Sequence, residues 1–464
     1  MKLFNTMTGE KAELVPIEEG HVRMYACGPT VYNFFHIGNA RCFVVFDMLR
    51  RYLEYRGYKV TFAQNFTDVD DKIIKKANEE GITSAEVAEK YIKEYFTDAE
   101  GLGIKKATIH PKATENIDSI IDIVSVLIEK GFAYESCGDV YFQPKKFKDY
   151  GKLSHMPIDE LEAGARIDVS DQKRDPLDFA LWKAAKPGEP AWDSPWGKGR
   201  PGWHIECSAM VRKYLGQPID IHCGGKDLAF PHHENEIAQS EAACGCTFAN
   251  FWLHNGFISV DNEKMSKSLG NFFTVRDVAE KYGYDVIRYF LLSAHYRKPV
   301  NYSAEVLEAS LSALDRIHNC EESLSFYIKN AESGTLDESV KKTADERRAQ
   351  FITAMDDDLN TADGIAAVFE LVKDCNLLVN GKTPIMSLES AEYLYGVLRE
   401  LTTLLGIEKK ESADDDSEIL AKIAERAEAK KAKNYALADS IRKELADKGI
   451  ILEDTPAGTK YKRV

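Results

Sequence analysis

Two kinds of apolar pattern alternate near the start of the chain. Residues 22–27 form a short apolar run that a Gly-Pro pair ends, which is typical of a buried strand. In residues 40–57 the apolar side chains recur at helical spacing, and Gly57 ends the predicted helix. Residues 58–66 form a second apolar run. Strand, helix and strand in this order predict a βαβ unit, from which doubly wound parallel sheets are built.

The following stretch predicts helices at residues 84–100 and 114–131, where apolar residues again have helical spacing. Residues 132–144 resemble a hairpin with its turn at Gly138. Residues 145–202 are rich in Pro, Gly and Trp. We expect this last segment to be an irregular insertion within the sheet domain.

Sheet-like patterns return after the insertion. A strand is expected at residues 219–222. Pro231 is expected to open a helix that runs to about Cys244, because proline suits the first helical turn. Residues 257–261 are again strand-like.

The rest of the chain is almost wholly helical in pattern from Ser303 to Leu405, and it ends in a small module with a strand-like run at residues 450–452. The predicted architecture is an α/β domain with a doubly wound parallel (Rossmann-like) sheet and an insertion, followed by an α-helical bundle and a small C-terminal α+β module. The predicted parts are 1–115 and 203–256 for the two halves of the sheet domain, 116–202 for the insertion, 257–305 for a region with a lysine-containing loop, 306–407 for the bundle, 408–416 for a charged linker and 417–464 for the terminal module.

Length and composition are typical of a globular protein with several domains, since the chain has 464 residues, 44% hydrophobic and 29% charged. No apolar run is long enough for a membrane-spanning helix, and the polar first residues do not resemble a signal peptide. We therefore expect a cytoplasmic protein without a membrane partner, in which thiols stay reduced. The nine cysteines are then interpreted as core thiols and a few metal ligands.

Charge is distributed unevenly along the chain. The net charge of −15 argues against nucleic-acid binding for the chain as a whole. Residues 417–464 nevertheless hold 11 Lys and Arg against 8 Asp and Glu, a net of +3, which leaves −18 for the remainder. The last residues combine cations with Tyr461, as contact with phosphates and unstacked RNA bases requires. On composition alone, a solvated charged tail is an equally good interpretation.

The tetrapeptide His36-Ile37-Gly38-Asn39 comes directly before the first predicted helix. A helix N-terminus offers unpaired N–H groups and a partial positive charge, both of which suit phosphate. His36 can add a donor, and Gly38 allows a nucleotide to approach the backbone. Taken alone, the tetrapeptide is better explained as an ordinary loop histidine before a helix.

A second motif, Lys264-Met265-Ser266-Lys267-Ser268, lies far downstream. Two lysines and two hydroxyls in a short loop can hold a triphosphate and stabilise the charge that develops as pyrophosphate leaves. A generic pair of lysines would be a solvated basic turn, but the full pentapeptide is much more specific.

In order and separation the two motifs resemble the paired HIGH and KMSKS signatures of class I aminoacyl-tRNA synthetases. The resemblance implies activation of an amino acid by ATP, with Mg²⁺, and then transfer to tRNA. It gives His36, Lys264 and Lys267 catalytic roles, and it assigns ATP contacts to His36, Gly38, Asn39, Lys264, Ser266 and Lys267. Asn39 stands where the family has His, so we expect some loss of activation rate without loss of binding.

A set of soft and nitrogen donors suggests a metal site. His232 and Glu236 are four residues apart on the predicted helix, and therefore on one face of it. Cys27 ends the first predicted strand and Cys207 is placed near another end of the sheet, so all four are expected at its carboxyl edge. Two thiolates, an imidazole and a carboxylate suit tetrahedral zinc. Spacing alone leaves open that these are core cysteines.

The segments around these residues resemble the signatures of cysteinyl-tRNA synthetases. They are residues 26–32, 201–210 and 230–240, and the resemblance extends over essentially the whole chain. It implies that Cys27, Cys207, His232 and Glu236 bind one Zn²⁺, which then binds the thiolate of substrate cysteine. It also implies a stem-contact region at 257–305, an anticodon-binding module at 417–464, and a monomer with tRNA(Cys), cysteine and ATP as partners.

Other substrate contacts follow from the same resemblance. Gly28, Thr67, Trp203 and His222 are expected to line the cysteine pocket. The alternatives are a core indole for Trp203, a strand-end imidazole for His222 and a helix-capping threonine for Thr67. Cys223 stands where the family usually has glycine, so we expect crowding of the local backbone there, but not a metal ligand.

Zinc explains how such an enzyme would distinguish cysteine from serine. The two amino acids differ by one atom, and a pocket that selects by shape alone discriminates near-isosteres by only ~10–200-fold. Zinc prefers a soft thiolate to a hydroxyl. Two other hypotheses remain: a cysteine:amino-sugar ligase of mycothiol synthesis, built on the same core without the terminal module, and an inactive RNA-binding paralogue.

Overall fold

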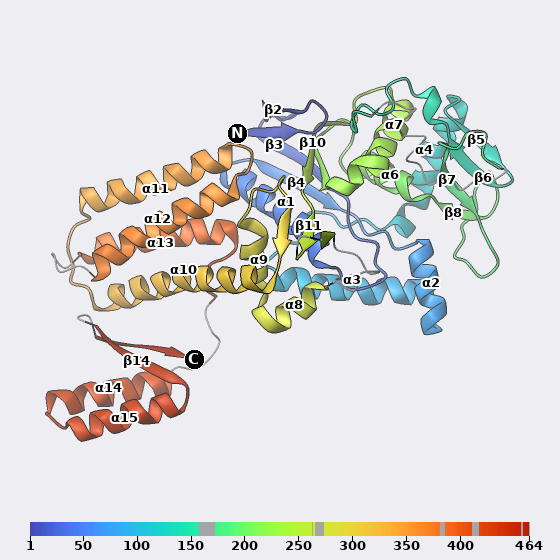
Figure 1. Ribbon diagram of the computed structural model, residues 1–464. Coiled ribbons are helices and arrows are strands. Elements are labelled where there is room, and N and C mark those ends of the chain that lie inside the picture. Colours follow the sequence, from blue (N-terminus) through green and yellow to red (C-terminus); the bar gives the residue numbers. More distant parts are fainter. Residues whose placement is uncertain are drawn as a thin grey trace. The chain divides into compact units, whose positions relative to one another are not determined.

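The computed structural model describes residues 1–156, 172–261, 263–264, 273–380, 386–410, 417–455 and 458–463 (Figure 1). The chain forms two compact units. The first comprises Met1–Leu311 and Thr353–Gly364, and the second Ser312–Ile352 and Ile365–Val464. Within the described ranges, no helix has both the length and the apolar character needed to cross a membrane.

A four-stranded parallel sheet lies at the centre of the first unit. Its strands are β3 (His21–Ala26), β4 (Lys59–Gln64), β9 (Ile219–Gly225) and β10 (Ala249–Asn255), in the order β10-β9-β3-β4. The strand that comes first in the sequence is central, with β4 on one side and β9 on the other. The carboxyl ends of β3 and β9 therefore form a topological switch point, where ligands bind in such sheets.

The helices that cover this sheet agree with the apolar pattern. Helix α1 (Ile37–Tyr55) packs against β4, β9 and β10 through an almost continuous buried face. Helices α6 (Trp203–Tyr214) and α7 (Glu234–Cys244) bury Met210 and Ile237 in a core that they share with strand residues. The predicted doubly wound sheet is confirmed.

The start of α7 agrees with the prediction that Pro231 opens this helix. The helix is assigned from Glu234, and a turn at Ala229–His233 leads into it. Phe230 is the residue in this turn with extended angles, φ −140° and ψ 135°, whereas His233 and Glu234 are helical. The break in the helix therefore lies before Pro231. His232 and Glu236 keep the predicted spacing of one helical turn, with Nε2 and Oε1 3.0 Å apart.

The predicted hairpin is confirmed as β5 (Ala133–Ser136) and β6 (Asp139–Phe142). The expectation of an irregular insertion is wrong in part, because β7 (Phe179–Ala184) and β8 (Gly199–Pro201) extend the hairpin to a four-stranded sheet, β5-β6-β7-β8. Trp182 of β7 is fully buried in this sheet's core. Tertiary packing overrides the local Pro- and Gly-rich composition here.

Further elements complete the first unit. A three-stranded sheet consists of β12 (Glu263–Lys264), β11 (Ile258–Val260) and β13 (Val300–Tyr302), in this order. The remaining elements of this unit are β1 (Lys2–Asn5), β2 (Glu10–Glu13), α2 (Asp71–Glu80), α3 (Ser84–Gly101), a 3₁₀ turn (Ala113–Asn116), α4 (Ile117–Glu129), a 3₁₀ turn (Pro144–Lys146), a 3₁₀ turn (Lys226–Leu228), α8 (Val275–Tyr282) and α9 (Tyr284–Leu292).

The second unit is mainly helical, as predicted. Its elements, three of which begin or end in the first unit, are α10 (Ala304–Asn330), α11 (Glu338–Asp356), α12 (Thr361–Asn380), α13 (Leu388–Leu405), α14 (Ser417–Lys431), α15 (Tyr435–Asp447), β14 (Ile450–Thr455) and β15 (Gly458–Arg463). The terminal elements have a small apolar core of their own that includes Ile419, Leu445 and Leu452. Arg426 forms a bidentate ion pair with Asp454 at 2.8 and 2.9 Å.

Candidate active site

Four potential metal ligands converge at the switch point of the central sheet. Cys27 follows β3, Cys207 lies on α6, His232 lies in the turn before α7, and Glu236 lies on α7. All four are buried, and their donor atoms lie within 4.8 Å of one another. Cys207 was expected near a strand end but belongs to a helix, whose first turns face the end of β3. The structure thus brings together the four residues that the sequence singled out.

Three of four donor separations in this quartet fit tetrahedral zinc. The Sγ atoms of Cys27 and Cys207 are 3.8 Å apart, Glu236 Oε1 lies 3.4 Å from Cys27 Sγ, and His232 Nε2 lies 3.8 Å from Cys207 Sγ. Tetrahedral zinc, with bonds of ~2.3 Å to sulfur and ~2.0–2.1 Å to nitrogen or oxygen, requires donor separations of about 3.3–3.8 Å. Glu236 Oε1 and His232 Nε2 are closer, at 3.0 Å, and form a direct ion pair. The two thiols, one imidazole and one carboxylate suit zinc in chemistry, and zinc would have to separate this pair slightly.

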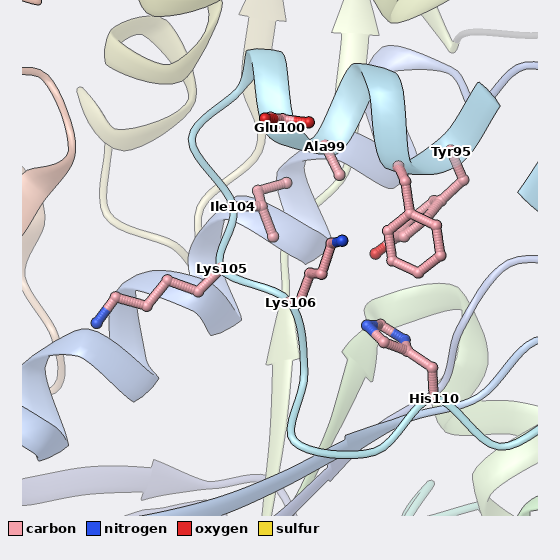
Figure 2. Close-up of a pocket in the computed structure, with 8 residues that line it drawn as sticks. Tyr95, Ala99, Glu100, Ile104, Lys105, Lys106 and His110 are labelled. Carbon is pink, nitrogen blue, oxygen red and sulfur yellow. The ribbon is translucent and has the colours of Figure 1, made fainter. Parts of the chain in front are cut away.

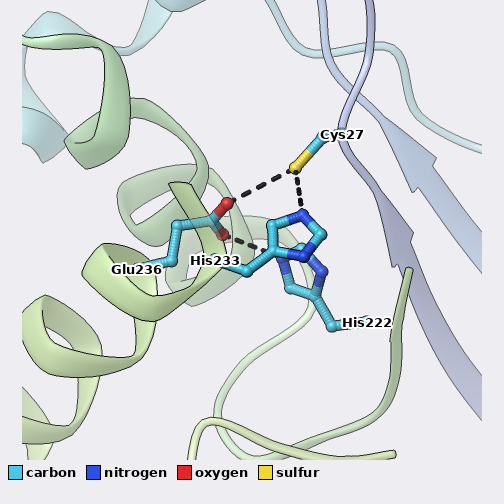
Figure 3. A group of neighbouring side chains, drawn as sticks. All are labelled: Cys27, His222, His233 and Glu236. Carbon is cyan, nitrogen blue, oxygen red and sulfur yellow. Dashed lines mark hydrogen bonds and ion pairs between the residues drawn. The ribbon is translucent and has the colours of Figure 1, made fainter. Parts of the chain in front are cut away.

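A second group of donors overlaps the quartet and consists of Cys27, His222, His233 and Glu236 (Figure 3). Its ring nitrogens hold the shared ligands by hydrogen bonds. His222 Nε2 lies 2.8 Å from Glu236 Oε2, and His233 Nε2 lies 3.3 Å from Cys27 Sγ. Because this group lacks the second thiol, we assign its two histidines to the outer layer, where they orient the ligands.

Behind His233 a chain of hydrogen bonds sets the proton positions. His233 Nδ1 lies 2.8 Å from His254 Nε2, and His254 Nδ1 lies 2.8 Å from the Thr6 hydroxyl. If Thr6 donates to His254 and His254 donates to His233, then His233 has its proton on Nε2 and donates it to Cys27. Burial lowers the pKa of His254 to about 3 and the pKa of His233 well below its usual range, which agrees with two neutral rings.

The pKa values of the quartet are shifted even without a metal. A hydrogen bond from Cys27 lowers the pKa of Cys207 to about 6. Burial acts to lower the pKa of His232, but the Glu236 carboxylate outweighs it and raises the pKa to about 10. Burial likewise opposes ionisation of Glu236, yet His222 and His232 hold its pKa well below the usual range. A metal that binds here would displace protons from His232 and from Cys27.

The outer nitrogen of His232 is also held. His204 Nδ1 lies 2.8 Å from His232 Nδ1, and burial lowers the pKa of His204 well below its usual range. A neutral His204 can accept a hydrogen bond from His232 Nδ1, which leaves Nε2 directed at Glu236.

The residues expected to line the cysteine pocket surround the quartet. Trp203 is 42% exposed and stacks on His232, with ring centroids 4.2 Å apart. His222 is buried and stacks on Trp252. Thr67 is buried and donates a hydrogen bond to Glu206. Gly28 lies so close to the backbone of Asn65 that a Cβ there would come within 1.6 Å of its carbonyl oxygen. Their roles in substrate binding stay predictions.

His36 occupies the N-cap of α1, at the predicted nucleotide side. Its Nδ1 accepts hydrogen bonds from the backbone N–H groups of Gly38 and Asn39, at 3.1 and 3.3 Å. Asn39 Oδ1 in turn accepts from the His36 backbone N–H at 3.4 Å, which completes a capping box. Since Nδ1 accepts, the ring proton lies on Nε2, and this atom is a donor. Asn39 therefore helps to cap the start of α1. The observation that Asn39 stands where the family has His did not predict this role.

The lysine motif is described only in part. Lys264 ends β12, while Ser266 and Lys267 lie outside the described residues. The chain that follows the motif is anchored beside the start of α1. Ile37 N–H donates to the Phe273 carbonyl at 3.2 Å, and Val275 N–H donates to the Phe35 carbonyl at 3.1 Å. The segment that begins at Phe273, after the lysine motif, therefore adjoins the start of α1.

Three other cysteines lie near the quartet in the sequence, and two of them correct an expectation. Cys223 is buried, and its thiol donates to the Tyr25 carbonyl at 3.2 Å. It is in neither group of potential metal ligands among the described residues. Cys244, the last residue of α7, forms a disulfide with Cys246, which contradicts the expectation that thiols stay reduced. The two cysteines flank Gly245, whose φ of 77° turns the chain back on itself and brings the two sulfurs together.

A cavity of about 240 Å³ elsewhere in the first unit contains none of the predicted site residues (Figure 2). It is lined by Tyr95, Phe96, Ala99, Glu100, Ile104, Lys105, Lys106 and His110. The imidazole of His110 is engaged at both nitrogens, with Gln64 O at 3.0 Å and with Ala107 N at 3.0 Å. This cavity is therefore separate from the predicted cysteine and ATP sites.

Sequence reasoning named His222 but missed four other residues around the quartet. His204, Glu206 and His233 lie within the signature segments but were given no role there, and His254 was not singled out. One usable signal was His254, a polar side chain that directly follows the apolar residues 251–253 in β10. The pairing of His233 with it depends on tertiary structure, and no periodicity predicts such a contact.

Comparison with known proteins identifies the family. Residues 13–312 match the family described as tRNA synthetases class I (C) catalytic domain, and residues 350–409 match the DALR domain. The chain is 57% identical to a cysteine-tRNA ligase of Clostridioides difficile and 56% identical to one of Caldicellulosiruptor saccharolyticus, each over 100% of both chains.

A solved structure supports the fold independently. Mycobacterium tuberculosis methionyl-tRNA synthetase in complex with methionyl-adenylate aligns with a TM-score of 0.61 at 18% identity, over 83% of this chain and 90% of that one. This similarity concerns the fold alone. Together with the full-length relatives and the matched catalytic domain, it shows that the chain belongs to the cysteine-tRNA ligase family of class I aminoacyl-tRNA synthetases.

Proposed function

We propose that the protein activates cysteine with ATP and attaches it to the 3′-terminal ribose of tRNA(Cys). The observation that carries this proposal is the buried quartet of Cys27, Cys207, His232 and Glu236 at the switch point. Its donor set suits a thiophilic metal, and it lies in a chain whose full-length relatives are named cysteine-tRNA ligases.

The quartet would hold Zn²⁺ through its two thiolates, the His232 imidazole and the Glu236 carboxylate. When bound, zinc supplies a Lewis acid that prefers the thiolate of cysteine to the hydroxyl of serine. His222 and His204 would keep Glu236 and His232 oriented, since each hydrogen-bonds to one of these ligands at 2.8 Å. His233 would donate to Cys27 and stabilise its thiolate. Trp203, stacked on His232, would cover the pocket.

In the activation step a carboxylate oxygen of cysteine attacks the α-phosphorus of ATP, and the bond to the bridging oxygen of the β-phosphate breaks. The products are cysteinyl-adenylate and pyrophosphate, which leaves with Mg²⁺. The start of α1 would attract the phosphates through its partial positive charge and the Nε2–H donor of His36, with Gly38 allowing close approach. The backbone N–H groups of Gly38 and Asn39 would not contribute, because they donate to His36 Nδ1. Lys264, Ser266 and Lys267 are proposed to stabilise the charge on the leaving pyrophosphate.

The transfer step requires tRNA. The ribose hydroxyl of the terminal nucleotide attacks the carbonyl carbon of the adenylate, an ester bond forms and AMP leaves. We assign tRNA recognition to residues 257–305 and to the positively charged module at 417–464.

Pyrophosphate exchange tests the proposal directly. The purified protein, loaded with zinc, should exchange labelled pyrophosphate into ATP when cysteine is added and not when serine replaces it. Equal exchange with the two amino acids would refute selection by the metal. A parallel measurement with tRNA or an amino sugar as acceptor separates the synthetase from the mycothiol-type ligase, since only the synthetase charges tRNA.

A truncation tests the role of the terminal module. Protein that ends at Asp416 should still form cysteinyl-adenylate, because the quartet and both ATP motifs remain, while the kcat/KM for tRNA charging falls. Undiminished charging would show that residues 417–464 do not recognise RNA.

A further inference from the structure

A buried carboxylate outside the quartet adjoins the predicted cysteine pocket. Glu206 lies on α6 next to Cys207 and is only 1% exposed. Its Oε2 accepts a 2.8 Å hydrogen bond from the Thr67 hydroxyl. Its Oε1 has no hydrogen-bond partner among the residues that the structure describes. Burying a carboxylate with an unsatisfied oxygen is unfavourable, so its presence calls for an explanation in function.

Thr67 is fixed against the loop that follows β3. Its backbone N–H donates to the Pro29 carbonyl at 3.2 Å, and its carbonyl accepts from Val31 N–H at 3.2 Å. Asn65 connects the same two segments: its Oδ1 accepts from Gly28 N–H at 2.9 Å, and its Nδ2 lies 3.5 Å from Thr67 Oγ1. Two residues of the predicted pocket, Gly28 and Thr67, are thus held in one hydrogen-bonded network with Glu206.

The bond to Glu206 determines how Thr67 can meet a ligand. A hydroxyl has one proton to donate and two lone pairs to accept with. Glu206 Oε2 can accept the hydrogen bond from this proton in two states, when the carboxyl is ionised and when it carries its own proton on Oε1. Thr67 is then limited to accepting hydrogen bonds on its pocket side. The α-ammonium group of an amino acid has three donors and no acceptor, so it is the complementary partner.

We propose that Glu206 is a positioning residue that holds the Thr67 hydroxyl as an acceptor for the α-ammonium group of the amino-acid substrate. The inference rests on the proposed function, because it takes a free amino acid as the ligand. The pocket then recognises two groups of cysteine separately, the thiol at the metal and the ammonium group at Thr67.

Two thiol ligands distinguish recognition of the ammonium group from recognition of the thiol. Cysteine has the ammonium group, and 3-mercaptopropionate has the same thiol and carboxylate without it. Calorimetric titration of zinc-loaded protein gives the ratio of the two affinities. Glu206→Leu, which cannot accept from Thr67, should reduce the preference for cysteine by about 10- to 100-fold, as expected for loss of a hydrogen bond to a charged group. Glu206→Gln, of similar size and with an amide oxygen that can accept, should restore most of the preference.

The role through Thr67 has its own test. Thr67→Val should reduce the preference as much as Glu206→Leu does, and the double variant should lose no more than either single variant. Ser208→Ala, on the other side of Cys207 in α6, is the matched control and should leave the preference unchanged. Zinc content should stay equal in all variants.

Several results would overturn the inference. If Glu206→Leu weakens the binding of both ligands equally, or if it loses zinc, then Glu206 only stabilises α6. If Glu206→Leu does not fold, an unchanged preference in Thr67→Val is enough to reject the inference. A further loss in the double variant would show that Glu206 does not act through Thr67. Failure of the wild-type protein in pyrophosphate exchange would refute the proposed function instead, since the affinity ratio is measured without ATP.

Discussion

The amino-acid end and the nucleotide end of the candidate active site are built differently. At the amino-acid end, ligands from three separate segments of the fold are buried, and an outer layer of His204, His222 and His233 holds them. At the nucleotide end, His36 caps a helix through bonds to residues two and three positions further on. Under the proposed function, selection of the substrate side chain would depend on tertiary structure, whereas phosphate binding would start from local helix geometry.

This difference matters for mutation. A residue in the buried network has few substitutes, because its neighbours are arranged around one donor atom at one distance. A helix N-cap accepts several residue types, so its structural and chemical roles can be separated by substitution.

The largest effect is expected for Cys207→Ser. The variant removes one of two thiolates, so zinc content should fall well below one per chain and the KM for cysteine should rise more than about 100-fold. Metal analysis and pyrophosphate exchange measure these two quantities. Cys223→Ser is the matched control, since Cys223 is equally buried and lies outside the quartet. If Cys207→Ser keeps its zinc, a residue of the buried network can be replaced without loss. The proposed difference between the amino-acid end and the nucleotide end would then be wrong.

A pair of substitutions at His36 separates capping from chemistry. His36→Ala loses both the cap and the Nε2 donor, and His36→Asn keeps an N-cap side chain only. Both should reduce the kcat of pyrophosphate exchange by about 100-fold, the usual cost of losing one donor to a transition state. Only His36→Ala should also lose about 1 kcal/mol of stability, seen as a lower thermal midpoint. Full activity in His36→Asn would show that His36 only caps the helix and that its Nε2 donor has no role in the reaction.

A smaller effect is expected in the outer layer. His222→Phe keeps a ring to stack on Trp252 but cannot donate to Glu236. We expect about 10-fold weaker zinc binding, the lower end of the range for such partners, measured by competition with a chelator. An unchanged affinity would mean that Glu236 is held adequately by His232.

His110 provides a histidine without any metal role. Burial lowers its pKa to about 4, while an unfolded chain has the ordinary value of about 6.5. The native state therefore favours the neutral ring, and its stability is complete above the unfolded pKa and is lost as the pH falls toward 4. Between about pH 7 and pH 5 the loss from this residue should be about 2 kcal/mol.

Denaturant unfolding of His110→Gln at these two pH values measures that contribution. Glutamine can donate to Gln64 and accept from Ala107 but does not titrate, so the variant should lose less stability than the wild type on acidification. Parallel pH profiles for the two proteins would contradict this assignment.

Local pattern was enough for the central βαβ unit. The predicted helix of residues 40–57 corresponds to α1, which begins three residues earlier because His36 caps it. Periodicity could not predict β7, whose strand is stabilised by pairing with β6 and by burial of Trp182.

The site shows the same limit. Residue types and signatures pointed to the quartet, but its spacing depends on how α6, α7 and the end of β3 pack together. Glu206 and the outer histidines are found only through contacts that join segments far apart in the chain. Such contacts have no local pattern, because either partner alone is an ordinary buried polar residue.

The distance along the chain between the ligands has a consequence for synthesis on the ribosome. Cys27 and Glu236 are 209 residues apart, so the first ligand emerges long before the last. Most of the first unit must leave the exit tunnel before a complete metal site can form, and such long-range contacts form slowly. Acquisition of zinc would then mark nascent chains whose sheet has closed correctly, whereas chains that stall before His232 would lack half of the ligands.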